Sequence, residues 1–514
     1  MQLRESMELG GQHLLGWLDP ERDYLPTGSW AITHDLGRWW DAMLRLEHAT
    51  NFAIPAHVEG ANLRNLHWLT DNADGLLWVP PGLDWHPIKF ELHSLREGIL
   101  TFAALAQYRN NAWAHQAGRK YLESIRRGLK PDFTWDFDQF DYARYFTGGE
   151  NEDPGHKPSN EGRFALTVQH GRCIEALVWY YEATGDALAM ELAENLARFH
   201  LAYAIAPDGT IPDELAHRAI GDRQSHLYTL CGLLLFGCKT HQSEYVDAVV
   251  RTYRAGVPAL VNECGWVAHD MGQTRFPDQS GNLMANTEST GAAARLALWM
   301  ARYTAHTECY DDVERLVRAR LFPGQITPAD IHANPDLEIP SRALGGWGGN
   351  DYPHAGKGYN PSGTAEIVHT MSAIYQHISA LEEAGLVVYM HFDYADDAVE
   401  IKADRSAEAT LAVRPRIHDN VLIRVPGWAP PESVRIEVNG RPAALRMVGS
   451  FAYLGRQQLG ANSQIVLRHA LPTRRTQETM AAGDTYHFAW RGDQITGVHP
   501  NEWPLPFYPT LESP

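Results

Sequence analysis

Apolar residues recur every three or four positions over residues 30–384, in segments separated by loops rich in Gly, Pro, Asp and Trp. This spacing places apolar side chains on one face of a helix. It predicts helices at residues 95–108, 172–184, 187–203, 225–237, 243–261, 291–304, 311–321 and 364–381. Residues that typically end a helix follow the predicted segments, as Thr184-Gly185-Asp186 does at the end of residues 172–184. Successive helices without intervening strands predict a mainly α fold, a helical toroid rather than an alternating α/β fold.

The pattern changes after Gly385. Short runs alternate apolar and polar residues with a period of two, which is the spacing of strands that bury one face. They predict strands at residues 386–390, 399–402, 409–413, 421–425, 434–438 and 464–467. Turn signals such as Asn439-Gly440 separate them, as in a β-sandwich. We therefore expect two domains, a helical domain of residues 1–385 and a β-sandwich of residues 386–514.

The net charge limits the choice of partner. The chain has 514 residues, with 44 Lys and Arg against 63 Asp and Glu, which gives a net charge of −19. This charge argues against a nucleic acid or an anionic membrane surface and favours a neutral or cationic ligand. The sequence has no apolar run of membrane-spanning length and shows no signal peptide. We expect a cytoplasmic protein with no membrane partner, and a homo-oligomer is allowed.

The cysteines predict free thiols. There are five of them, an odd number, and no two form a C-x-x-C pair. A disulfide framework or a thiolate zinc site is therefore not expected, and the cysteines are predicted to be buried as thiols. They are Cys173, Cys231, Cys238, Cys264 and Cys309.

Two groups of motifs carry a family resemblance. Residues 286–291 read Asn-Thr-Glu-Ser-Thr-Gly, a helical run follows, and residues 310–315 read Tyr-Asp-Asp-Val-Glu-Arg. This resembles the β-L-arabinofuranosidase superfamily (glycoside hydrolase family 127 and relatives), in which a Glu-Thr-Cys triplet opens an inner barrel helix. Arg-Val-Pro-Gly-Trp-Ala at 424–429 and Val-Asn-Gly-Arg-Pro at 438–442 are similar to the sandwich of the same superfamily. The resemblance implies an (α/α)6 barrel, the catalytic domain, followed by a β-sandwich.

The same resemblance predicts three histidines that contact the substrate. Residues 170–186 are similar to a superfamily helix that begins with a substrate-binding histidine, and residues 225–227 stand where the family has Gly-His-Ala-Val-Arg. Residues 269–274 resemble the glycine-rich loop before the family's catalytic glutamate. The resemblance implies substrate contacts for His170, His226 and His269, and a neutral imidazole suits sugar hydroxyls because it donates and accepts hydrogen bonds. The alternative is that each histidine caps a helix or fills a loop core.

The chain departs from the family at the sulfur positions. In the family, the glutamate of Glu-Thr-Cys and a Cys-Cys-Pro-Pro-Asn motif hold zinc, and one thiolate is the nucleophile. Here Thr290, Tyr359 and Asn360 stand at the equivalent positions. We therefore expect no metal, no cofactor and no cysteine nucleophile.

We expect carboxylates to replace the family's thiolate and zinc in catalysis. Glycoside hydrolysis ordinarily needs one protonated carboxyl group and one ionised carboxylate that acts as nucleophile or base. Glu288 is one candidate, because it matches the family's cavity glutamate. Asp270 is the preferred second residue and Asp278 the alternative, since both lie on the loop before Glu288. Tyr359 is a further candidate nucleophile or base at the position of the lost thiolate.

Aromatic and polar residues gather in two other segments. Residues 347–360 combine glycines with aromatic and amide groups, a composition that suits sugar binding or a loop packed on the barrel rim. The predicted substrate-binding residues there are Trp347, Asp351, His354 and Asn360. Asp35 precedes two tryptophans and either contributes to a sugar subsite or caps the following helix.

The sequence therefore predicts a glycoside hydrolase that uses paired carboxylates instead of a zinc thiolate. A polysaccharide lyase is one alternative, with Tyr359 and His226 abstracting a proton from a uronate while Asn360 neutralises its carboxylate. The acidic chain lacks the arginine-rich stretch that a polyuronate would need. A non-catalytic sugar-binding relative is the other alternative.

Overall fold

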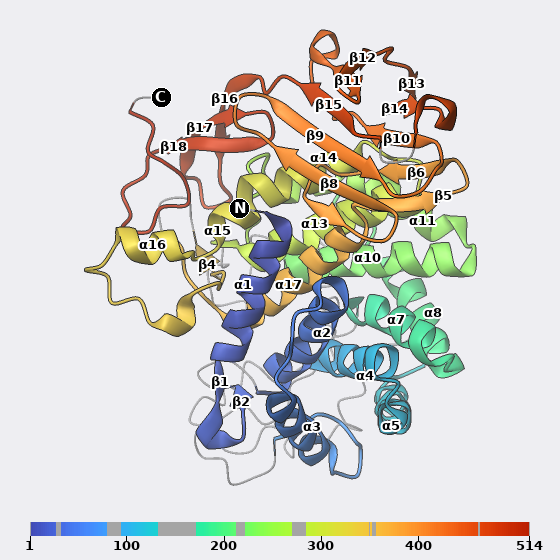
Figure 1. The fold of residues 1–514 in the computed structure, drawn as a ribbon. Helices are drawn as coiled ribbons and strands as arrows, with labels where there is room; N and C mark the ends of the chain where they lie inside the picture. The colour runs from blue at the N-terminus through green and yellow to red at the C-terminus, as the bar shows by residue number, and fades with distance from the viewer. Residues whose placement is uncertain are drawn as a thin grey trace.

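The computed structural model describes residues 2–26, 32–79, 94–131, 171–211, 222–269, 284–348, 350–351, 356–460 and 463–512. Helices dominate the first part of the chain, and the C-terminal strands lie together beside them (Figure 1). The mainly α part and the C-terminal sheets expected from the sequence are therefore present. No described helix combines the length and apolarity that crossing a membrane requires.

Within the described residues, six helices form a closed ring in which each packs against the next and the last returns to the first. Most residues of these helices, polar as well as apolar, are buried, so the helices are covered on nearly every side. They are α2 (Ile32–Thr50), α4 (Leu95–Arg109), α7 (Cys173–Thr184), α10 (Arg223–Thr240), α13 (Thr287–Tyr303) and α17 (Pro361–Gln376).

A second set of helices packs on the ring, one against each ring helix. Several of these are amphipathic, as in α5, where apolar residues face α4 and charged residues face solvent. In ring order from α2 they are α3 (Ala56–Thr70), α5 (Ala112–Arg127), α8 (Ala187–Tyr203), α11 (Ser243–Ala255), α14 (Cys309–Leu316) and α1 (Leu3–Gly16). Three short helices complete the described set: α12 (Val257–Leu260), α15 (Phe322–Gly324) and α16 (Pro328–Ala333).

In the described part of the chain, three sheets follow the helices. The five-stranded sheet has the order β13-β14-β10-β6-β5, the six-stranded sheet β12-β11-β15-β9-β8-β7, and the three-stranded sheet β16-β17-β18. Their bounds are β5 (Ser379–Glu382), β6 (Gly385–Val388), β7 (Tyr394–Ala395), β8 (Val399–Asp404), β9 (Ala409–Pro415), β10 (Val421–Arg424), β11 (Arg435–Val438), β12 (Arg441–Ala443), β13 (Met447–Val448), β14 (Phe451–Leu454), β15 (Ile465–His469), β16 (Thr473–Thr479), β17 (Thr485–Arg491) and β18 (Gln494–His499).

Two short strand pairs lie in the helical part. β1 (Leu18–Asp19) pairs with β2 (Leu25–Pro26), just before α2. β3 (Ala285–Asn286) pairs with β4 (Asn350–Asp351), which brings residues 350–351 beside the start of α13. This second pair therefore joins two segments that the sequence separates by about 60 residues.

Two of the resemblance motifs bind each other at the junction of helices and sheets. The buried guanidinium of Arg424 in β10 pairs with Asp311 and Glu314 of α14. Gly427 donates its backbone N–H to Asp311 at 2.8 Å. Tyr310 stacks on Tyr389 with ring centroids 5.0 Å apart. These motifs therefore fix the sheets to the helices.

Most predicted elements are confirmed, with three corrections. The helix expected at 364–381 ends at Gln376, because residues 379–382 pair with β6 as β5. The helix expected at 243–261 stops at Ala255, and α12 starts separately at Val257, next to Pro258. Helix α14 ends at Leu316 and a π-helical turn, Val317–Leu321, continues it. The sequence did not predict helices α1, α2, α3 and α5, nor strands β5, β7, β12 to β14 and β16 to β18.

Candidate functional site

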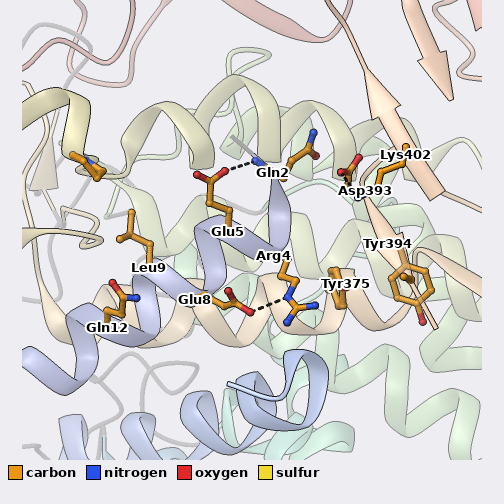
Figure 2. A pocket seen from close by; sticks show the side chains of 12 residues that line it. Gln2, Arg4, Glu5, Glu8, Leu9, Gln12, Tyr375, Asp393, Tyr394 and Lys402 are labelled. Atoms are coloured by element: carbon orange, nitrogen blue, oxygen red, sulfur yellow. Dashed lines mark hydrogen bonds and ion pairs between the residues drawn. The ribbon is translucent and has the colours of Figure 1, made fainter. Parts of the chain in front are cut away.

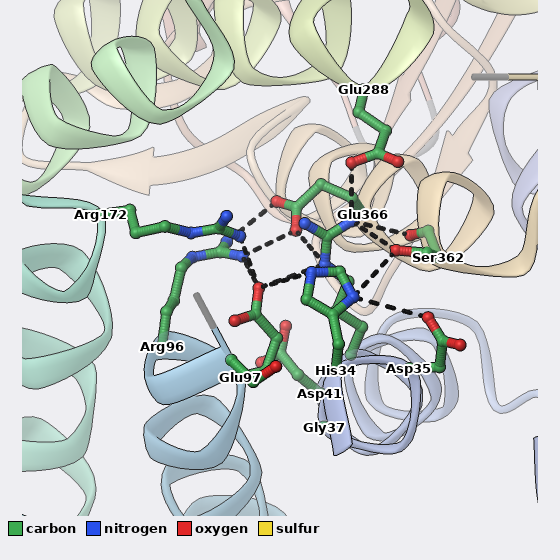
Figure 3. Close-up of polar contacts among 12 residues, drawn as sticks. His34, Asp35, Gly37, Asp41, Arg96, Glu97, Arg172, Glu288, Ser362 and Glu366 are labelled. Carbon is green, nitrogen blue, oxygen red and sulfur yellow. Dashed lines mark hydrogen bonds and ion pairs between the residues drawn. The ribbon is translucent and has the colours of Figure 1, made fainter. Parts of the chain in front are cut away.

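Side chains from the first two turns of the ring helices meet at one end of the ring (Figure 3). Arg38 of α2 lies at the centre of this group. Its Nη1 donates to Glu288 Oε2 at 2.7 Å and to Ser362 Oγ at 2.9 Å, and its Nε donates to Glu97 Oε1 at 3.2 Å. One guanidinium therefore joins α2, α4, α13 and α17.

The remaining two ring helices reach the same group. Gln224 of α10 donates its amide Nε2 to Glu288 Oε2 at 2.6 Å. Arg172, which precedes α7, donates to Glu97 Oε1 at 2.5 Å. The starts of all six ring helices thus converge on a few charged groups.

A second layer of charges fills the ring behind this group. Arg96 contacts both carboxylate oxygens of Glu366 at 3.0 Å, and Arg295 bridges Glu366 at 2.7 Å and Glu175 at 3.0 Å. The guanidiniums of Arg96 and Arg295 also lie 4.3 and 4.7 Å from the ring centroid of Tyr228. Burial raises the pKa of Glu366, but these guanidiniums outweigh it and hold that pKa well below its usual value.

Glu288 holds the position that the sequence assigned to it. It is 7% exposed and follows the first residue of α13. Asn286 caps this helix by accepting the N–H of Glu288 at 2.8 Å, so Glu288 is not the cap. Its Oε2 accepts both hydrogen bonds, and within the described residues no donor reaches Oε1. A Cβ added at Gly363 would lie 3.0 Å from Oε1, so α17 touches the carboxylate closely.

Asp35 lies in the first two turns of α2, and its side chain does not cap the helix. Its carboxyl group is buried, and no described residue donates a hydrogen bond to either oxygen. His34 Nδ1 lies 3.5 Å from Oδ1. Burial is the largest cause that raises the pKa of Asp35 well above its usual value, and the charges of Glu288 and Glu97 act in the same direction. Arg38 and the nearby hydroxyl of Ser362 lower that pKa in part.

Asp35 faces a small pocket lined by aromatic and apolar side chains. The pocket has a volume of about 10 Å³, room for roughly one water molecule. Its lining residues are Leu14, Trp17, Leu18, Pro26, Asp35, Trp39 and Pro361. The pocket thus joins α1, α2 and the start of α17.

Tyr359 and Asn360 lie just before α17, where Asn360 caps the helix and Tyr359 packs against aromatic rings. Asn360 Oδ1 accepts the N–H of Ser362 at 2.9 Å, which caps the helix. The Tyr359 ring packs edge-on against Trp17, with centroids 5.7 Å apart, and near His13 at 6.4 Å. In the part of the chain that the structure describes, no hydrogen bond or ring contact joins Tyr359 to His226.

Other predicted site residues are buried in the core, or they lie outside the described part of the chain. His226 in α10 is fully buried, and burial lowers its pKa to about 4. Trp347 is also fully buried, and its indole donates to the backbone of Leu321 at 2.7 Å. His269 is half-buried, and the side chain of Asp351 is not described. The predicted residues outside the described chain are His170, Asp270, Asp278 and His354.

The sulfur positions do not fit a zinc site. Thr290 donates its hydroxyl to the backbone carbonyl of Gly265 at 2.6 Å, and Asn360 serves as a helix cap. Across the described residues, no group of three or more His, Cys, Asp and Glu side chains could hold a metal ion. All five cysteines are free, and burial raises the pKa of Cys173 and of Cys309 to about 12. The expected free thiols are therefore confirmed, although Cys238 is only half-buried.

A larger groove lies elsewhere, between α1, the end of α17 and strands β7 and β8 (Figure 2). Its volume is about 500 Å³, and it shares no lining residue with the Asp35 pocket. Its charged groups bind each other, as in Arg4 with Glu8 at 2.8 Å and Lys402 with Asp393 at 3.1 Å. The groove therefore lacks the converging polar groups found at the start of the ring helices.

Sequence reasoning missed several residues of the site. Arg38, Gln224 and Ser362 all contact Glu288 or its partner, and the sequence analysis assigned no role to any of them. The available signal was a polar residue near the start of a helix, which many exposed helices share. Arg96 and Glu366 show the same signal.

Comparisons with known proteins show the fold. No family model matches the chain, and no curated protein matches its sequence. A glycoside hydrolase family 127 β-L-arabinofuranosidase from Geobacillus stearothermophilus T6 superposes with a TM-score of 0.59 and 14% identity, over 96% of this chain and 80% of that one. A second family 127 β-arabinofuranosidase gives a TM-score of 0.61 and 11% identity, over 96% and 78%. The chain shares the fold of these enzymes.

Proposed function

We propose that the protein is a glycoside hydrolase acting on a neutral or cationic carbohydrate. In this proposal residues 1–385 form an (α/α)6-barrel catalytic domain around the ring helices, and residues 386–514 form a β-sandwich. The observation that carries the proposal is the carboxylate of Glu288, which stands where six helix starts converge. The fold shared with family 127 enzymes supports it. The resemblance of the sequence around Glu288 to the motif of the family's cavity glutamate supports it as well.

The contacts of Glu288 suit the ionised member of a carboxyl pair. Arg38 at 2.7 Å and Gln224 at 2.6 Å fix Oε2, which orients the group. Oε1 then faces a substrate or water as the base or nucleophile. The second carboxyl group proposed from the sequence is Asp270 or Asp278, with substrate contacts from His170, His269, Asp351 and His354.

The lyase alternative has less support. It needs Tyr359, Asn360 and His226 around one uronate. The amide oxygen of Asn360 is already used by the start of α17, and His226 has no exposed ring atom to offer a substrate. Carboxylates and arginines that neutralise one another leave no free positive cluster at the described site for a polyuronate.

Product analysis tests the proposed function. A panel of 4-nitrophenyl glycosides and oligosaccharides should include one that releases a reducing sugar without near-ultraviolet absorption of an unsaturated product. Release of an unsaturated product would favour the lyase, and binding without turnover would favour a non-catalytic relative. Glu288→Gln should reduce turnover by about 10²- to 10⁴-fold in a protein that still folds. The matched control is Glu191→Gln, on the exposed side of α8, which should keep full activity.

A further inference from the structure

Gln224 uses both hydrogens of its side-chain amide inside the ring. It is the second residue of α10 and is 5% exposed. Its Nε2 donates to Glu288 Oε2 at 2.6 Å and to the phenol oxygen of Tyr228 at 2.9 Å. An amide nitrogen carries two hydrogens and cannot accept, so these two bonds use its full capacity. The amide of Gln224 therefore has one orientation, since a reversed amide would set its oxygen against the carboxylate.

Tyr228 is held by the charged layer behind the site. It lies four residues after Gln224 on α10, at the spacing that brings two side chains of a helix together. Its ring is fully buried, and the guanidiniums of Arg96 and Arg295 lie 4.3 and 4.7 Å from the ring centroid. Glu366 binds both of these arginines. The hydroxyl of Tyr228 is thus a fixed acceptor, and it orients the amide of Gln224.

Gln224 differs from Arg38, the other residue that binds Glu288 Oε2. The guanidinium of Arg38 also contacts Glu97 and Ser362, so its loss disturbs several helices. Within the described residues, the amide nitrogen of Gln224 contacts Glu288 and the phenol and no third group. Hydrogen bonds donated to a carboxylate favour its ionised form, and they also fix its direction. Gln224 can therefore act on the charge and the direction of Glu288 with little part in the rest of the network.

We propose that Gln224, held in place by Tyr228, is a positioning residue for Glu288, an assignment that rests on the function proposed above. Gln224 acts through Glu288 and not on the substrate. It keeps the Glu288 carboxylate ionised, and it turns Oε1 toward the reacting group. Tyr228 acts only through Gln224, because among the described residues its hydroxyl makes no contact with Glu288. Two side chains of α10 thus align the proposed base or nucleophile.

Steady-state kinetics on a glycoside that the wild-type protein cleaves test the positioning role. Gln224→Leu keeps a side chain of similar size but cannot donate. It should reduce kcat by about 10- to 100-fold and change KM by less than about threefold, because the substrate still binds while the carboxylate is misaligned. The acidic limb of the pH–rate profile should move to higher pH, since Glu288 loses a donor that favours its charge.

The matched control is Gln242→Leu. The amide of Gln242 donates to Thr240 at 3.1 Å, at the far end of α10, and its loss should change none of these values. A fall in the melting temperature of Gln224→Leu with an unchanged pH–rate profile would indicate a structural role and overturn the proposal.

A double-mutant cycle tests the link to Tyr228. Tyr228→Phe keeps the ring beside the arginines and removes only the hydroxyl, so kcat should fall by about 3- to 10-fold. The double variant Gln224→Leu/Tyr228→Phe should be as active as Gln224→Leu alone, since the hydroxyl acts through the amide. Tyr180→Phe removes the hydroxyl of another buried tyrosine, which donates to the backbone of His115 at 3.1 Å, and should keep full kcat. Multiplied losses in the double variant would overturn the proposal.

Infrared spectra test the positioning without a substrate. The difference between each protein and its own Glu288→Gln derivative isolates the carboxylate band of Glu288. In the Gln224→Leu background, this band should convert to that of the neutral acid at a higher pH than in the wild-type background. An unchanged titration would overturn the role of Gln224 and leave the hydrolase proposal standing. If the wild-type protein cleaves no glycoside, the proposed function fails, and the infrared titration alone decides whether Gln224 controls the charge of Glu288.

Discussion

The guanidinium of Arg38 lies 2.7 Å from the carboxylate of Glu288, although 250 residues separate them in the chain. Both side chains are almost fully buried, and the same guanidinium also contacts Glu97 and Ser362. The proposed base is thus part of the charge network that fills the ring. Stability and activity are therefore linked at this position, which permits a direct test.

Arg38→Met should destabilise the protein by about 3–5 kcal/mol, because it leaves buried carboxylates without their shared cation. Urea unfolding measures the change. Arg64→Met is the matched control, since Arg64 forms an exposed ion pair with Asp23 at the same 2.7 Å distance and should cost less than about 1 kcal/mol. Equal effects of the two substitutions would contradict the network described for the ring.

His226 should make the protein sensitive to acid. Burial alone lowers its folded-state pKa to about 4, from a usual value of 6.5. The unfolded chain then binds the proton more tightly, so this contribution to stability is complete above pH 6.5 and is lost as the pH falls toward 4. The loss is on the order of 3 kcal/mol.

Unfolding free energies at pH 7.5 and pH 5 check this expectation. His226→Leu should flatten the dependence on pH, since the leucine has no proton to gain. His241→Asn, at the exposed C-cap of the same helix, should leave the dependence unchanged. An undiminished pH dependence in His226→Leu would show that other groups cause it.

The periodicity of the sequence was enough to predict every ring helix except α2, and the strands β6, β8 to β11 and β15, because buried positions are mostly apolar and leave a pattern in the chain. β5 was missed because residues 379–382 continue the apolar spacing of α17, and only pairing with β6 makes them a strand. The motif at 310–315 was recognised, but its contact with Arg424 depends on residues more than 100 positions away. Such a contact has no local signal.

The candidate site was predictable only in part. Glu288 was found because its motif resembles a known family. Arg96 and Glu366 resemble ordinary helix residues in the sequence, and their pairing spans 270 positions. The sequence allowed two roles for Asp35, a helix cap or a subsite residue. The structure excludes the cap, because the carboxylate of Asp35 accepts no backbone N–H from the described residues. The sequence shows which side chains are polar, and the tertiary structure decides which of them lack a partner.

Activity should survive thiol alkylation and zinc chelation. No sulfur stands at the positions of Thr290, Tyr359 and Asn360, and burial raises the pKa of Cys173 to about 12, so that thiol stays unreactive. Turnover of the active glycoside after treatment with iodoacetamide or 1,10-phenanthroline measures this. Activity that is lost to the chelator and restored by zinc would show that the site uses a metal.

Two glycines give the sharpest test of the position of Glu288. A Cβ at Gly363 in α17 would lie 3.0 Å from Glu288 Oε1, whereas a Cβ at Gly291 in α13 would meet its nearest neighbour at 3.6 Å, an ordinary contact. Gly363→Ala should therefore displace the carboxylate and reduce kcat by about 10²-fold, because small misplacements of a reacting group are costly.

Gly291→Ala should keep wild-type kcat and stabilise the protein by about 0.5–1 kcal/mol, since alanine restricts the unfolded chain and fits the helix. Both variants add one methyl group to a ring helix near Glu288, so a general effect of crowding would affect them alike. Steady-state kinetics and thermal unfolding of the two variants distinguish displacement of the Glu288 carboxylate from a general effect of crowding. If Gly363→Ala is as active as Gly291→Ala, then the Oε1 side of Glu288 is not where the substrate reacts, and the assignment of Glu288 as base or nucleophile fails.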